Sequence, residues 1–177
     1  KKNLRSGVVT QLIYGDRFKI IKKEEKWLKI KNQEDSYKGF IKKNNFPLNE
    51  KSTHKVSVLK ANLYSKPNIR YKIKKKLSFG SKIKVLRKKD NFYKFDNFWI
   101  IKKDLKNISY KSKDIFKDVK KFINIKYKWG GKHFSGVDCS GLVQLFINFN
   151  NRFCPRDTKD QVRYFKRKIK IKKIKKK

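Results

Sequence analysis

One short run in this sequence gathers residue types that can perform nucleophilic chemistry, namely Asp138, Cys139, Ser140 and Gly141 in succession. Behind it, apolar residues recur every three or four positions, which predicts a helix over residues 139–149 that begins at the cysteine. The first turn of a helix offers unpaired backbone N–H groups and the positive end of the helix dipole, and both stabilise a thiolate. Cys139 is therefore a candidate nucleophile, and the same N–H groups can hold an oxyanion.

A second interpretation of Cys139 is that of a small buried hydrophobic residue, which is the usual role of a free cysteine. The chain has two cysteines, Cys139 and Cys154. They make no disulfide framework and lack the spacing of a zinc site, so we expect neither a metal nor a cofactor. Cys154 precedes Pro155, and we expect it to pack in the interior rather than to take part in chemistry.

Two motifs around Cys139 carry a resemblance to a known family. An aromatic residue, Tyr127, precedes a Trp-Gly-Gly turn, and the Asp-Cys-Ser-Gly-Leu run follows that turn. Further on, Pro155-Arg156-Asp157-Thr158 fits a Pro-Arg-Asp-Ser/Thr motif. Together the two motifs resemble the NlpC family of papain-like cysteine peptidases, which cut the peptide stems of the bacterial cell wall.

The resemblance implies a reaction and a set of roles. The Cys139 thiolate would attack the amide carbonyl that follows γ-D-glutamate in a cell-wall peptide with a free N-terminal L-alanine, and water would hydrolyse the thioester. Asp138 would hold the substrate ammonium group, because a carboxylate is its natural partner. The other substrate-binding residues that the resemblance implies are Ser140, Tyr127, Arg156, Thr158, Asp16 and Tyr37.

Several of these residues also have a structural interpretation. Arg156 could brace the site instead of pairing with a substrate carboxylate, and Arg156 and Asp157 could simply cap and pair at the helix that follows. Tyr127 could belong to the core.

A thiol nucleophile needs a base, usually a histidine, and the chain has two histidines. We expect His54 to be an exposed residue of a connecting segment, and His133 to lie at the rim of the site. In the family, the catalytic histidine comes from strands beyond the point where this sequence ends. We therefore expect these residues to be an incomplete and inactive piece of a peptidase. The first strand of the peptidase sheet would be approached by Ile169, Ile171 and Ile174.

The first two thirds of the chain contain an internal repeat. Residues 14–21 align with residues 79–86, and residues 27–30 align with residues 92–95. Short alternating runs bounded by Gly-centred turns predict strands in each copy. In the first copy the predicted strands are residues 8–14, 17–21, 27–30 and 37–41. Each copy looks like a bacterial Src-homology-3-type barrel, a module that commonly precedes the NlpC-type domain.

We therefore predict an α+β fold in three parts. Two small all-β barrels cover residues 1–48 and 49–107, and the N-terminal helical half of a papain-like domain covers residues 108–177, with most of its C-terminal sheet missing.

The third part contains two further predicted helices. An amphipathic pattern predicts one over residues 114–124, capped by Asp114. Thr158 and Gln161 have the spacing of a capping box, which predicts a short helix that ends at Tyr164.

The net charge of +38 would suit nucleic acid or an anionic surface as a partner. The lysines, however, are spread evenly and accompany abundant Ile, Asn and Phe, a mixture that an A- and T-rich genome produces. We therefore expect a peptidoglycan-derived peptide and no specific nucleic acid as the partner, with the oligomeric state left open. The alternative is a non-catalytic protein whose barrels and basic surface bind wall polymer or nucleic acid.

No apolar run of about 18 residues predicts a membrane span. The unpaired cysteines and the absence of an export signal favour the bacterial cytoplasm.

Overall fold

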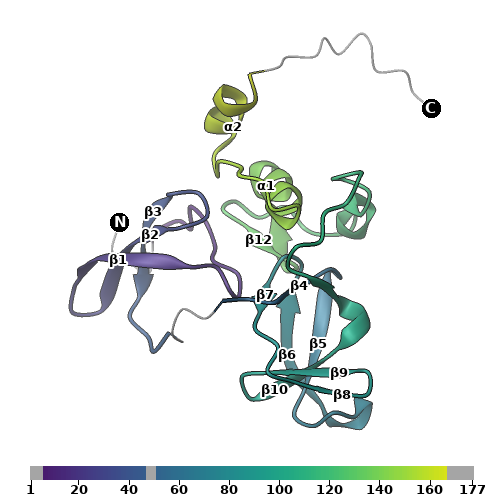
Figure 1. Ribbon diagram of the computed structural model, residues 1–177. Coiled ribbons are helices and arrows are strands. Elements are labelled where there is room, and N and C mark those ends of the chain that lie inside the picture. The colour runs from purple at the N-terminus through teal and green to yellow at the C-terminus, as the bar shows by residue number, and fades with distance from the viewer. Residues whose placement is uncertain (1–5, 47–50, 167–177) are drawn as a thin grey trace.

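The computed structural model describes residues 6–46 and 51–166, which form two β-rich units and a helical region (Figure 1). The predicted approach of Ile169, Ile171 and Ile174 to a further strand lies outside the described residues. Among the described residues, no helix is both long and apolar enough to cross a membrane.

The first unit is a three-stranded antiparallel sheet in the order β1-β2-β3. Its strands are β1 (Phe18–Lys23), β2 (Trp27–Asn32) and β3 (Lys38–Lys42). The alternation in β2 buries Leu28 and Ile30 and turns the lysines outward.

The strand predicted over residues 8–14 is not formed. The alternating pattern is present, but this segment pairs with no neighbouring strand and lies instead against the glycine-rich turn. A side chain on Gly130 would come within 2.4 Å of the Val8 carbonyl oxygen.

The second unit contains two sheets, in the orders β6-β5-β10-β9-β8 and β11-β4-β7. Its elements are β4 (His54–Val56), β5 (Lys60–Tyr64), η1 (Ile69–Tyr71), β6 (Lys72–Ser78), β7 (Lys82–Ile83), β8 (Arg87–Lys89), β9 (Phe92–Phe95), β10 (Phe98–Ile101), η2 (Lys102–Asp104) and β11 (Leu105–Asn107). Val56, Ile83, Phe95 and Ile100 form the centre of its core.

The internal repeat is visible in the structure. Gly15 and Gly80, which the alignment matches, both adopt positive φ angles, of 87° and 81°. Glycine suits these two turns because it adopts left-handed backbone angles at little cost. The antiparallel pair β2-β3 also corresponds to the pair β9-β10. Among the described residues, the hydrogen bonds leave the sheets open and close neither unit into a barrel.

His54 does not lie in an exposed connection, so that prediction was wrong. It is a residue of β4, and it pairs with Asn107 on one side and Ile83 on the other. Its ring packs edge-on against Tyr93, and burial followed by the charge of Lys88 lowers the pKa of the imidazole.

The helical region contains η3 (Val119–Phe122), the two-stranded hairpin β12 (Lys132–His133) and β13 (Gly136–Val137), and the helices α1 (Cys139–Phe149) and α2 (Thr158–Phe165). The bounds predicted for α1 are confirmed. The α-helix predicted over residues 114–124 is wrong, because this segment forms turns and the single 3-10 helix η3. Asp114 caps a turn there by accepting from the Phe116 N–H at 2.9 Å.

One apolar cluster joins all three parts of the molecule. Ile13 from the first unit and Phe79 from the second meet Phe146 and Phe149 of α1. The rings of Phe79 and Phe149 are stacked with their centroids 4.6 Å apart. Burying an aromatic side chain of this kind contributes about 2–3 kcal/mol, so α1 is held in place by both β-rich units.

Candidate active site

The start of α1 is built around the carboxylate of Asp138. Asp138 is the N-cap, and its Oδ1 accepts from the backbone N–H of Gly141 at 2.7 Å. Only glycine fits at position 141, because a Cβ there would lie 2.4 Å from the Gly131 carbonyl oxygen and 2.8 Å from Asp138 Oδ1. This close packing makes Cys139 the first residue of the helix.

The glycine-rich turn supplies a second donor to the same carboxylate. The Gly130 N–H donates to Asp138 Oδ2 at 2.8 Å. Gly130 has a φ of 70°, a left-handed angle that favours glycine. The turn and the helix are therefore tied together through one side chain.

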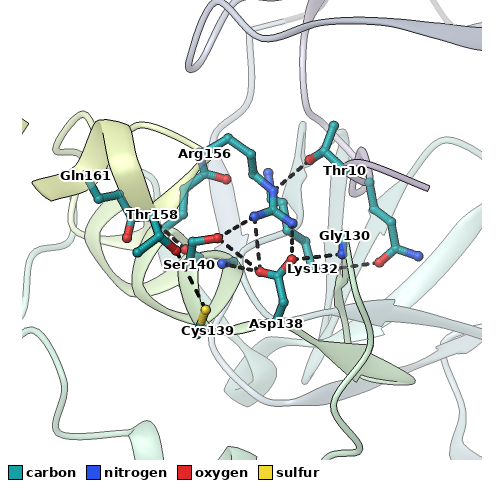
Figure 2. Close-up of polar contacts among 12 residues, drawn as sticks. Thr10, Gly130, Lys132, Asp138, Cys139, Ser140, Arg156, Thr158 and Gln161 are labelled. Atoms are coloured by element: carbon teal, nitrogen blue, oxygen red, sulfur yellow. Dashed lines mark hydrogen bonds and ion pairs between the residues drawn. The ribbon is translucent and has the colours of Figure 1, made fainter. Parts of the chain in front are cut away.

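Arg156 forms a bidentate ion pair with Asp138, the residue that precedes Cys139 (Figure 2). Its two terminal nitrogens donate to Asp138 Oδ1 at 3.1 Å and Oδ2 at 2.7 Å, and one of them also donates to Ser140 Oγ at 2.8 Å. The remaining nitrogen, Nε, donates to Thr10 Oγ1 at 2.9 Å. Arg156 thus braces the site, which is one of the roles that the sequence left open, and its contacts reach the first unit.

The pKa of the Asp138 carboxyl is lower than usual. Burial by itself would raise this pKa, but the hydrogen bonds from Arg156, Gly141 and Gly130 and the positive charge of Arg156 outweigh the effect of burial. The buried guanidinium therefore meets a charged carboxylate at neutral pH.

Cys139 is exposed to solvent, whereas Cys154 is completely buried. The sulfur of Cys139 lies 3.7 Å from Thr158 Oγ1, a distance compatible with a hydrogen bond involving sulfur (Figure 2). Burial raises the pKa of the Cys154 thiol to about 11. The expected packing role of Cys154 is confirmed, and the buried alternative for Cys139 is excluded.

Thr158 reaches the sulfur because α2 begins beside α1. The N-cap of α2 is Asp157, one residue earlier than predicted, and the capping box between Thr158 and Gln161 is not formed. Gln161 instead donates from Nε2 to the carbonyl oxygens of Ser140 and Pro155, each at 2.9 Å. The glutamine therefore fastens α2 to the start of α1 (Figure 2).

The first unit contributes Tyr37 to the edge of the site. Burial raises the pKa of the Tyr37 phenol, and the nearby carboxylate of Asp157 raises it further. The neighbouring Asp35 accepts from Gln144 of α1 at 2.9 Å. The structure thus places Tyr37 next to Asp157, the residue that precedes Thr158.

Asp16 contacts the hairpin β12-β13. Its Oδ2 is 3.4 Å from Lys132 Nζ in a buried ion pair, and the same oxygen accepts from the Ile13 N–H at 3.1 Å. Asp16 therefore joins the first unit to the hairpin β12-β13. Its predicted substrate contact stays a prediction.

Tyr127 is 66% exposed, so the core alternative is excluded. It bridges to Val137, which precedes Asp138 in the chain. The nearby Trp129 is also exposed. Both rings therefore present apolar surface next to the glycine-rich turn.

Neither histidine is hydrogen-bonded to Cys139 within the described part of the chain. His133 Nδ1 is 2.9 Å from Ser135 Oγ, its ring lies against Phe134, and burial followed by the charge of Lys128 lowers the pKa of the imidazole. No group of acidic, His or Cys side chains suited to a metal is found in residues 6–46 and 51–166.

Four residues that lie in α1 or contact the site from other parts of the chain were not predicted from the sequence. Gln144 had a local signal, since it is a polar residue within an apolar helical run. The others depend on how the units pack, and no local pattern marks them. These residues are Thr10, Asp35 and Lys55.

Comparison with known proteins identifies the region that carries this site. Residues 124–176 match the model of the NlpC/P60 family. This region is therefore similar to the NlpC/P60 family, whose members are cysteine peptidases. Residues 2–46 match the model of the bacterial dipeptidyl-peptidase Sh3 domain. The resemblance drawn from the motifs is confirmed, whereas the exact boundaries at residues 48 and 107 stay predictions.

Solved structures support the fold. An NlpC/P60 family protein from Bacillus cereus ATCC 10987 aligns with a TM-score of 0.74 and 20% identity, over 87% of this chain and 59% of that one. The chain thus spans 59% of the length of that NlpC/P60 protein. The α+β class, with an Src-homology-3-like N-terminal region, is confirmed.

NlpC2 from Trichomonas vaginalis aligns over 82% of this chain and 58% of that one at 22% identity, with a TM-score of only 0.34. A search of curated proteins gave no match.

Proposed function

We propose that this chain provides the nucleophile of a cell-wall peptide hydrolase, and that the nucleophile is Cys139. The observation that carries the proposal is the contrast between the two cysteines. Cys139 is exposed at the first turn of a helix whose start is fixed by a buried ion pair, whereas Cys154 is sealed in the interior. The helix dipole and the free N–H groups of that turn favour a thiolate and a developing oxyanion.

The reaction we propose is acyl transfer through a thioester. The sulfur of Cys139 bonds to the amide carbonyl carbon, the C–N bond breaks, and the amine leaves with a proton from a general acid. Water then adds to the thioester, gives up a proton, and releases the acid and the thiol. Thr158 would orient the thiol through its contact with the sulfur.

We propose as substrate a peptide of the type L-Ala-γ-D-Glu-diamino acid, cut after γ-D-glutamate. Two β-rich units ahead of the NlpC/P60 region support this choice. The first unit supplies Tyr37, which lies near Asp157, and Thr10, which accepts a hydrogen bond from Arg156. These contacts support the proposal that the first unit shapes one end of a substrate groove.

Asp138 and Ser140 have a role in this proposal that their contacts support directly. Asp138 receives hydrogen bonds from two backbone N–H groups and from Arg156, and Ser140 Oγ lies in the same network. We propose that they position Cys139. Their direct contact with the substrate, the ammonium contact of Asp138 included, stays a prediction, as do those of Arg156, Thr158 and Tyr127.

Alkylation tests the nucleophile. Iodoacetamide at neutral pH should modify Cys139 in the folded protein and leave Cys154 untouched until denaturant is added, as peptide mass spectrometry will show. Modification of Cys154 first, or of neither thiol, would contradict the proposal.

Hydrolysis tests the reaction. With L-Ala-γ-D-Glu-diamino acid peptide and the full-length gene product, Cys139→Ser should lower kcat/KM by about 10⁴-fold or more. Cys154→Ala is the matched control and should retain activity. Equal turnover by the wild type and Cys139→Ser would exclude a thiol nucleophile.

Cys139→Ser also distinguishes the hydrolase from the alternative function. A non-catalytic binder of wall polymer or nucleic acid would keep its steeply salt-dependent binding after Cys139→Ser, because that binding depends on the lysines. A cytoplasmic location also stays a prediction.

A further inference from the structure

The second unit carries a groove that shares no residue with the Cys139 site. It has a volume of about 750 Å³. In the view of Figure 1, β9 and β10 of this unit lie at the opposite end of the molecule from α1 and α2. We call it the second-unit groove. It is lined by His54, Ile69, Asn91, Phe92, Tyr93, Ile101, Lys102, Lys103, Leu105, Lys106 and Asn107.

The charge of the groove is of one sign. Lys102, Lys103 and Lys106 are exposed, and no carboxylate is among the lining residues. Asp104, which lies between these lysines in the chain, is not part of the lining, and burial raises the pKa of its carboxyl. A ligand with negative charges therefore fits this surface.

The groove also offers apolar contact. Ile69 in η1 is 68% exposed, although it lines the groove. Ile101 and Leu105 line the same groove. An apolar group of a ligand would cover the Ile69 side chain and remove it from water.

The aromatic residues of the groove favour a peptide over a nucleic acid as its ligand, because they are buried. Phe92 and Tyr93 are each only 8% exposed, and the ring of Tyr93 is packed against His54 and lies under Lys88. They offer no free ring face, whereas single-stranded nucleic acids are held by exposed aromatic rings on which bases stack.

The backbone of β11 and the amide side chains that line the groove suit a peptide ligand. Within residues 6–46 and 51–166, β11 is an edge strand that pairs with β4 alone, and all its residues line the groove. An extended peptide can add to such an edge. The amide side chains of Asn91 and Asn107 can bond to a peptide backbone.

We propose that the second-unit groove binds an extended acidic peptide. Carboxylates of the peptide pair with Lys102, Lys103 and Lys106, and an apolar side chain of the peptide covers Ile69. This binding does not depend on Cys139, so it stands or falls separately from the proposed hydrolase activity.

The probe is a fluorescein-labelled peptide Glu-Leu-Glu-Leu-Glu, and its binding is followed by fluorescence polarisation near 150 mM salt. We expect saturable binding to the whole chain, and at least 10-fold weaker binding to the triple variant Lys102→Glu, Lys103→Glu, Lys106→Glu. The matched control is Lys19→Glu, Lys23→Glu, Lys42→Glu, three exposed lysines of the first unit with the same change in net charge. The control should weaken binding less than about 2-fold. Equal losses in the two variants would show non-specific attraction to a basic protein and overturn the proposal.

Two further arms test the ligand and the apolar contact. The peptide Gln-Leu-Gln-Leu-Gln should fail to bind, and Ile69→Ser should weaken binding of the acidic peptide without loss of the folded state, since Ile69 is mainly exposed. An oligothymidylate that competes more strongly than the peptide, and loses its binding in the groove variant, would show a nucleic-acid site instead.

Amide shifts in the wild type give a readout that needs no variant. Addition of the acidic peptide should shift the NMR signals of residues 91–93 and 102–107, and leave those of residues 139–149 unchanged. Shifts confined to other surfaces would overturn the proposal. Cys139→Ser should bind the peptide as the wild type does.

Discussion

Lys55 of β4 donates a hydrogen bond from its ammonium group to the carbonyl oxygen of Phe149, the last residue of α1, at 2.5 Å. The lysine is only 1% exposed, and it also donates to the Tyr110 carbonyl oxygen and to Asn151 Oδ1. A cation at the C-terminus of a helix is favoured by the helix dipole. The helix that carries Cys139 is thus held by a buried charge at each end.

The first prediction concerns Lys55. Lys55→Met removes the donor to the buried Phe149 carbonyl group and to the partly buried Tyr110 carbonyl group, which should lower the free energy of unfolding at pH 7 by about 1–3 kcal/mol. Urea denaturation measures this. Lys74→Met, at an exposed position of β6, is the control and should change little.

The cost of Lys55→Met should also depend on pH. Burial, followed by the charges of Lys82 and Lys111, lowers the pKa of Lys55 from 10.5 to about 8. Between about pH 8 and 10.5 the unfolded chain therefore binds more protons at this position than the folded one, so stability contributed by Lys55 rises with pH. The difference between wild type and Lys55→Met should be larger at pH 10 than at pH 7. A smaller difference at pH 10 would contradict this account.

The second prediction concerns the opposite end of α1. Asp138→Asn leaves the buried Arg156 without a charged partner, which should cost about 3 kcal/mol. The folded pKa of Asp138 lies below its ordinary value of 3.8, so the stability it contributes is present above that pH and is lost as the pH falls through the folded pKa. The difference in unfolding free energy between wild type and Asp138→Asn should therefore shrink below about pH 4. A difference that does not change with acidification would be inconsistent with the ion pair.

The third prediction concerns the glycine inside the first turn of α1. Gly141→Ala would place a methyl group 2.4 Å from the Gly131 carbonyl oxygen, so the helix start must shift. We expect a loss of about 2–4 kcal/mol, within the range of overpacking and strain, and a changed rate of Cys139 alkylation. Gly39→Ala is the control, because no atom lies within 4 Å of the position that its new methyl group would occupy. Thermal unfolding and alkylation kinetics together separate the two variants.

The fourth prediction concerns the contact between the first unit and α2. Tyr37→Phe removes the hydroxyl beside Asp157 and should cost about 1 kcal/mol or less. Because burial and Asp157 raise the pKa of Tyr37, the variant should also lack one phenol that ionises above pH 10 in an ultraviolet titration. Tyr71→Phe, at an exposed position, serves as the control for stability. If the phenol that Tyr37→Phe lacks ionises at the ordinary value of about 10 or below it, the placement of Tyr37 beside Asp157 is contradicted.

The start of α1 could be predicted from the sequence because its causes are local. Asp138 caps, Gly141 permits the close turn, and the apolar period from Leu142 onward gives the buried face. The repeated units could be predicted for the same reason, since the turns at Gly15 and Gly80 need left-handed backbone angles in both copies.

The segment over residues 114–124 shows where periodicity misleads. Its apolar residues have helical spacing, and Phe122 is buried in the shared cluster. Ile123, however, is 73% exposed, and Val119 also faces solvent. Tertiary packing uses only part of the apolar pattern, and the chain forms turns and a 3-10 helix instead of an α-helix.

The partners of the site could not be predicted, because they come from distant parts of the chain. Thr10 meets Arg156, Asp35 meets Gln144, and Lys55 meets the end of α1. No spacing rule relates such residues, since their contacts follow from how the units dock. Thr158 and Gln161 are a related case, because the bonds of Gln161 to Ser140 and Pro155 replaced the expected local cap.

The bond between Thr10 and Arg156 has a consequence for how this protein can vary. A change of side chain at position 10 alters the hydrogen bonding of the guanidinium that steadies the thiol-bearing helix, although the two positions stand near opposite ends of the described chain. Natural variants should therefore alter these two positions together. An Src-homology-3-like unit transplanted from a relative should preserve the geometry around the sulfur only when it brings a matching hydroxyl.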